Sequence, residues 1–143
     1  MSESAHQISE FVKTAFELLS NAGRDRIRAG DPEFVERAIA YLEADPYFDG
    51  TGYCKSNLVR YLKLVPFSPT QQDRLQSVVL HVIDTYGHYG GKHVCRLAAS
   101  VQSPEFLSHL RERLKSPDYD IRRRARNVYE YVQRFNKTNK YKG

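Results

Sequence analysis

The sequence has 143 residues, of which 41% are hydrophobic, and its formal net charge is +5. This length suits one domain with a core that needs neither disulfides nor metal, and two cysteines exclude a disulfide framework. No apolar run reaches the ~18–20 residues of a membrane span, and the N-terminus lacks the order of a secretion signal. We therefore expect a soluble, cytoplasmic, single-domain protein.

Seven segments repeat apolar residues at helical spacing between capping or helix-breaking residues. The first helix, whose apolar face includes Val12, ends at Gly23 and precedes a basic connector, 24–30. Asp31, Ser68 and Ser103 each cap a helix that begins with proline. The seven helices are expected at residues 4–22, 31–45, 51–65, 68–86, 92–101, 103–114 and 120–135, the last capped by Asp120 and carrying Phe135 on its apolar face.

One phrase occurs twice along the chain. Asp31-Pro32-Glu33-Phe34-Val35 returns 72 residues later as Ser103-Pro104-Glu105-Phe106-Leu107, and Ser68-Pro69 divides the interval nearly in half. A period near 36 in a helical pattern is typical of stacked repeats. No segment alternates with period two. We therefore predict an all-α fold of about seven helices stacked as antiparallel pairs.

A family resemblance supports this architecture. Pro117-Asp118-Tyr119-Asp120-Ile121-Arg122, followed by Ala125 and Val128, resembles the first helix of a HEAT repeat. Val59-Arg60 and Cys95-Arg96-Leu97-Ala98 resemble the same motif less closely. The resemblance implies a HEAT-like α-solenoid over residues 31–135, with a compact, non-repetitive helical bundle as the alternative. We expect residues 1–135 to form one helical-repeat domain and 136–143 a disordered basic tail.

The sequence indicates no catalytic, cofactor-binding or metal-binding residue. Gly87–His93 superficially resembles a phosphate loop. Such a loop has four residues between its first Gly and the Gly-Lys pair, followed by Ser or Thr, whereas here three residues separate Gly87 from Gly91 and His93 follows Lys92. His81, His88, His93 and Cys95 do not follow the paired spacing of zinc ligands, and His81 is expected to face solvent or a groove. No paired carboxylates suit acid–base catalysis. We predict a non-catalytic protein without a small-molecule substrate.

Positive charge is concentrated at the C-terminal end. Residues 110–143 hold 11 Lys or Arg and 4 Asp or Glu, whereas the rest of the chain holds 11 and 13. Such a surface could neutralise phosphates of a nucleic acid, or Glu130 could pair with Arg126 and Arg134 at helical spacing. A nucleic-acid surface could extend over residues 111–142. The predicted basic patch within it consists of Arg122, Arg123, Arg124, Arg126, Arg134 and Lys137.

The favoured functional prediction is recognition of a protein partner along the concave face of the stack. The residues do not distinguish among an adaptor, an inhibitor and an immunity-type role for such a protein-binding module. Nucleic-acid backbone binding through the basic patch is the alternative. The predicted partner-binding residues are Gln71, Arg74, His81, His109 and Arg113.

Overall fold

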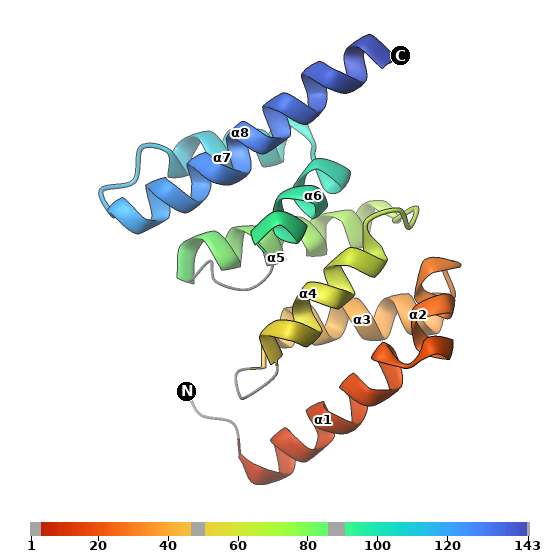
Figure 1. The fold of residues 1–143 in the computed structure, drawn as a ribbon. Coiled ribbons are helices and arrows are strands. Elements are labelled where there is room, and N and C mark those ends of the chain that lie inside the picture. Colours follow the sequence, from red (N-terminus) through yellow and green to blue (C-terminus); the bar gives the residue numbers. More distant parts are fainter. Residues whose placement is uncertain (1–3, 47–50, 86–90, 143) are drawn as a thin grey trace.

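The computed structural model describes residues 4–46, 51–85 and 91–142, apart from the side chains of residues 51, 91, 92 and 140–142. The described chain is all-helical, as predicted, and contains no strand. The described residues form eight helices, one more than expected, which are labelled in Figure 1. They are α1 (Ala5–Leu19), α2 (Asn21–Arg28), α3 (Pro32–Ala44), α4 (Thr51–Leu62), α5 (Pro69–Thr85), α6 (Gly91–Val101), α7 (Pro104–Arg113) and α8 (Tyr119–Lys142).

The additional helix is α2, which replaces the expected connector. Ser20 is extended, with ψ 161°, and its hydroxyl accepts a hydrogen bond from the Gly23 amide at 3.0 Å. The chain therefore turns at Ser20, and Gly23 lies inside α2 instead of ending the first helix. Gly23 is required by close packing, because a Cβ there would lie 2.2 Å from the carbonyl oxygen of Glu17.

The caps at the proline-led helices follow the sequence prediction. Asp31 accepts hydrogen bonds from the amides of Glu33 and Phe34, and Ser103 accepts one from the amide of Phe106. Ser68 and Gln71 bond each other reciprocally at the start of α5. These short-range contacts depend on a few consecutive residues, which is why the sequence predicts them.

The last helix differs from its expected bounds at both ends. Asp118, and not Asp120, accepts hydrogen bonds from the amides of Asp120 and Ile121, at 2.8 and 3.2 Å. At the other end α8 continues past residue 135 to Lys142. No glycine or proline follows Tyr119 before Gly143, and Asn136 is fixed by hydrogen bonds to Gln102, so nothing local ends the helix at the expected place.

The helices form a stack of pairs in two rows. α3 packs on α4, α5 on α6 and α7 on α8, while α4, α6 and α8 follow one another in one row (Figure 1). α3 and α5 adjoin in the second row, with α7 behind α8. α1 and α2 pack together and cover α3 and α4 at one end. The core runs continuously between the rows, from Leu18 to Val132.

Two residues that were expected to face the core are largely exposed. Val12 on α1 is 37% exposed and Phe135 on α8 is 38% exposed. Both belong to helices at the ends of the stack, where no further described helix covers the apolar stripe. Among the described residues, no helix combines the length and apolar character that crossing a membrane requires.

Gly23→Ala tests the close contact between α1 and α2. In an ordinary helix this change stabilises by about 1 kcal/mol, but here we expect a loss of roughly 1–3 kcal/mol because the new methyl overlaps backbone atoms. Urea unfolding measures the difference. Asn21→Ala, an exposed change in the same turn, is the control. A Gly23→Ala protein that is more stable than wild type would contradict this packing.

Candidate binding surfaces

The five predicted partner-binding residues lie on two helices of the same row. Gln71, Arg74 and His81 are on α5, and His109 and Arg113 are on α7. The structure also shows what each side chain contacts within the chain. Gln71 belongs to the cap of α5, and the other four make the contacts described below.

Arg74 joins α5 to α3. Its guanidinium donates hydrogen bonds to both oxygens of Glu36 at 2.8 Å and to Glu43 at 2.6 and 3.0 Å. This bonding holds the pKa of Glu43 below its ordinary value and raises that of Arg74. Bidentate Arg–carboxylate contacts fix geometry as well as charge. Arg74 therefore stabilises the stack and offers few free donors to a partner.

His81 is exposed, as predicted, and belongs to a second contact between helices. Asp45 ends α3 in the left-handed conformation, with φ 48°. Its carboxylate contacts Lys55 Nζ of α4 at 2.6 Å and His81 Nε2 of α5 at 2.9 Å. Lys55 is only 1% exposed, so this contact between charged groups is largely removed from water. It brings α3, α4 and α5 together.

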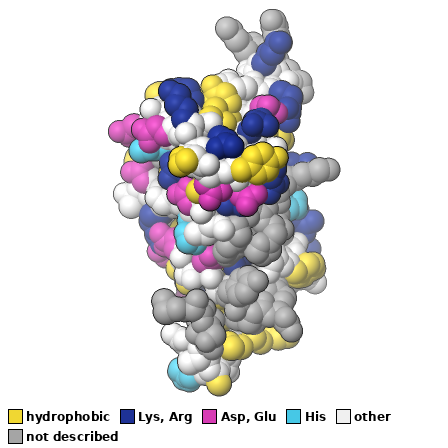
Figure 2. Space-filling model, turned by 90° about the vertical axis from the view of Figure 1, so that its left-hand side faces the viewer, with side chains coloured by type: hydrophobic (Ala, Val, Ile, Leu, Met, Phe, Trp, Pro, Cys, Tyr) yellow, Lys and Arg dark blue, Asp and Glu magenta, His cyan; other side chains and the backbone are white. Residues whose placement is uncertain are grey.

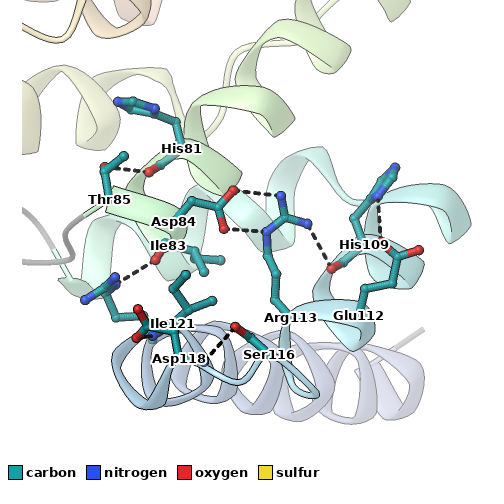
Figure 3. Close-up of polar contacts among 11 residues, drawn as sticks. His81, Ile83, Asp84, Thr85, His109, Glu112, Arg113, Ser116, Asp118 and Ile121 are labelled. Atoms are coloured by element: carbon teal, nitrogen blue, oxygen red, sulfur yellow. Dashed lines mark hydrogen bonds and ion pairs between the residues drawn. The ribbon is translucent and has the colours of Figure 1, made fainter.

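Arg113 links α7 to α5, as Figure 3 shows. Both ends of its guanidinium donate to the Asp84 carboxylate at 2.8 Å, and this bonding raises the pKa of Arg113. His109 contacts Glu112 on its own helix at 3.6 Å. All five predicted residues thus have a carboxylate partner or a capping contact. Arg74, His81 and Arg113 contact carboxylates from other parts of the stack, whereas the contacts of Gln71 and His109 lie within their own helices.

A shallow pocket of about 210 Å³ lies between α3 and α5. Its lining residues are Leu42, Glu43, Arg74, Ser77, Val78 and His81. Sites for drug-sized ligands usually occupy about 300–1,000 Å³. The pocket is too small for such a ligand, and its charged groups already contact each other.

The predicted basic patch divides into structural and solvated residues. Arg124 donates to the Ile83 carbonyl in the last turn of α5 at 2.7 Å, where a cation suits the helix dipole. Arg122 donates to the Ser116 carbonyl at 2.7 Å and lies over the Tyr119 ring. Arg123 is 3.9 Å from Asp120. Arg122 and Arg124 thus hold the start of α8 in place, whereas the Arg123 contact lies within the helix.

The remaining patch residues are exposed on α8 and form no ion pair with a described carboxylate. We call Arg126, Arg134 and Lys137 the α8 cations. Glu130 forms no ion pair with Arg126 or Arg134, although the helical spacing allowed one, and no described residue pairs with Lys137. Figure 2 shows that Lys and Arg are interspersed with Asp and Glu on the side near the start of α8. The free cations are thus a subset of the predicted patch.

A second group of cations was missed by the sequence analysis. Arg60 of α4, Lys63 just after it and Arg96 of α6, here the α4–α6 cluster, lie in the same row as α8. No described carboxylate forms an ion pair with any of them. The available signal was the pair of HEAT-like phrases Val59-Arg60 and Cys95-Arg96, which place two arginines 36 residues apart at equivalent positions.

The histidines and cysteine considered for metal binding do not converge. His81 contacts Asp45, whereas His93 lies on α6, and His88 and Gly87–Gly90 are outside the described residues. Burial raises the pKa of the Cys95 thiol, which donates a weak bond to the Asn127 carbonyl at 3.8 Å. Within the described chain no three His, Cys, Asp or Glu side chains are placed to hold a metal ion.

No protein-family model matches this sequence, and neither the curated proteins nor the solved structures give a match. What these surfaces bind must therefore be inferred from their own residues and geometry.

A double-mutant cycle of Arg113→Ala and Asp84→Ala tests the link between α5 and α7. We expect a coupling free energy of about 0.5–1 kcal/mol, decreasing with salt, because the pair is bidentate but partly solvated. Urea unfolding of the four proteins measures it. An Arg111→Ala and Asp84→Ala cycle is the control and should give no coupling. Zero coupling for Arg113 and Asp84 would show that the contact does not stabilise the stack.

Proposed function

We propose that this chain is a non-catalytic, HEAT-like helical-repeat module that binds the phosphate backbone of a nucleic acid along α8. The observation that carries the proposal is that three exposed cations, Arg126, Arg134 and Lys137, form no ion pair with any described carboxylate. Lys and Arg that contact phosphates release condensed counterions, which supplies affinity without base recognition. A solvated helix face with free cations can make this kind of contact.

The placement of the HEAT-like phrases supports the repeat part of the proposal. Val59-Arg60 lies on α4, Cys95-Arg96 on α6 and Ile121-Arg122 on α8, and these three helices are neighbours in one row. Equivalent phrases therefore occupy equivalent places in successive pairs. Repeat arrays of this kind usually provide extended surfaces for macromolecules.

A protein partner on α5 and α7 receives less support. Arg74, His81 and Arg113 contact carboxylates of their own chain, and a partner would have to compete with those contacts. By comparison, the α8 cations lose no internal contact when a phosphate approaches. The protein-partner prediction is retained as an outcome of the experiment below.

Arg126→Gln combined with Arg134→Gln tests the proposal. Glutamine removes the positive charges without adding repulsion toward Glu130. We expect wild-type protein to bind generic duplex DNA at low salt, with affinity that falls steeply as salt rises. The double variant should bind more weakly and lose about two units of the slope of log K against log salt, since each contact contributes about 0.9. Fluorescence anisotropy measures both quantities.

Arg111→Gln combined with Lys115→Gln is the matched control. It removes the same charge from the basic C-terminal segment, but on α7 and the turn after it. We expect this variant to retain the wild-type slope. Equal losses in both variants would contradict α8 as the surface, and no duplex binding at low salt would overturn the proposal. Binding to polyglutamate in place of duplex would indicate an acidic protein partner.

A further inference from the structure

The α4–α6 cluster gathers cations around one histidine. α4 and α6 pack side by side, and the Ser100 hydroxyl donates to the Lys63 carbonyl at 3.0 Å, which ties α6 to the end of α4. Arg60, Lys63 and Arg96 all act electrostatically on His93, in the first turn of α6. In the part of the chain that the structure describes, no carboxylate offsets their charge.

A further arginine adjoins this cluster from α2. The Arg28 guanidinium lies 5.1 Å from the centre of the Tyr61 ring, and that of Arg60 lies 5.5 Å from the same ring. Each guanidinium thus has a cation–π contact with the same ring. Arg60 also donates to the Asn57 side-chain oxygen at 2.8 Å, which helps to fix its position. Arg60 is therefore held by neutral groups, which leaves its charge available to an anion.

His93 has unused hydrogen-bonding capacity. No described residue bonds either ring nitrogen, and Nδ1 is buried without a partner. Burial lowers the pKa of His93, and Arg96, Arg60 and Lys63 lower it further. The other neighbouring groups are Cys95 on α6 and Arg134 on α8, which acts on Cys95. Among the described residues, the charged groups that act on His93 are all positive, and they disfavour the protonated ring.

We propose that Arg60, Lys63, Arg96 and His93 form a phosphate-binding site between α4 and α6, occupied by a phosphodiester of the nucleic acid that contacts α8. The site rests on the function proposed above and extends it to the centre of the stack. Packed helices lie about 8–10 Å apart, so α4 and α8 are roughly 20 Å apart. Phosphates recur about every 3.4 Å along each strand, so one polymer can reach both helices.

Binding at this site should be coupled to proton uptake. A phosphate offsets the surrounding cations and accepts a hydrogen bond from the protonated ring, so the pKa of His93 should rise. The free-state pKa lies below the ordinary value of 6.5. Affinity should therefore increase as pH falls through the bound-state pKa toward the lower free-state pKa, and His93→Gln should remove this pH dependence.

An NMR pH titration of the full chain tests the site. The probe is a short oligothymidylate at low salt, and the imidazole signals of His6, His81 and His109 are references for long-range charge effects. We expect saturation with the probe to raise the pKa of His93 by about one unit or more. We expect Arg60→Gln combined with Arg96→Gln to weaken oligothymidylate binding roughly tenfold and to abolish the response of His93.

Circular dichroism confirms that each variant is folded, and Arg111→Gln is the single-arginine control. If oligothymidylate binds without changing His93, the site is overturned while the function proposed for α8 stands. If His93 responds to inorganic phosphate but no nucleic acid binds, the nucleic-acid occupant and the proposed function both fail. A response that survives removal of Arg60 and Arg96 would also overturn the site, because the anion would then be held elsewhere.

Discussion

The last turn of α6 is the junction on which the arrangement of the stack depends. Ser100 bonds the Lys63 carbonyl after α4, while the Val101 carbonyl accepts bonds from Gln72 and Gln76 of α5. The next residue, Gln102, exchanges two hydrogen bonds with Asn136 of α8, at 2.7 and 2.8 Å. Helix ends leave carbonyl groups without partners in their own helix. Here they are satisfied by neighbouring helices, so three successive residues fix α4, α5 and α8 around α6.

The helix arrangement that this junction fixes decides which charged side chains meet. Along the sequence, acidic residues are frequent in the early part and basic residues at the end, which suggests a division by chain position. In the stack, pairing does not follow chain order. Arg74, Arg113 and the buried Lys55 contact carboxylates of other helices, whereas Arg60, Lys63, Arg96 and the α8 cations form no ion pair with a described carboxylate. Cations without a described carboxylate partner therefore occur in the middle of the chain as well as at its C-terminal end.

The sequence predicts the elements better than their contacts. Caps at Asp31 and Ser103 depend on neighbouring residues, so they can be predicted from a short segment. Ser20 was missed because no proline follows it, and Gly23 resembles a helix stop although it serves close packing. The α8 patch was predicted from composition. The division of this patch into structural and free arginines could not be predicted, because Arg124 bonds a carbonyl 41 residues away.

The α4–α6 cluster was not predicted for the same reason: contacts between distant segments cannot be read from a short stretch of sequence. Arg60 and Arg96 were recognised as part of a repeat phrase, but the phrase does not say whether such arginines are paired. Pairing depends on carboxylates from distant segments, as with Arg74, whose partners are 31 and 38 residues away. A terminal repeat needs a polar outer face, which is a sufficient structural reason for charge on α8. That reason does not apply to Arg60 and Arg96, because α4 and α6 are not the last helix of the stack. The observation that led us to propose an anion there is the buried Nδ1 of His93, which has no partner and lies beside these cations.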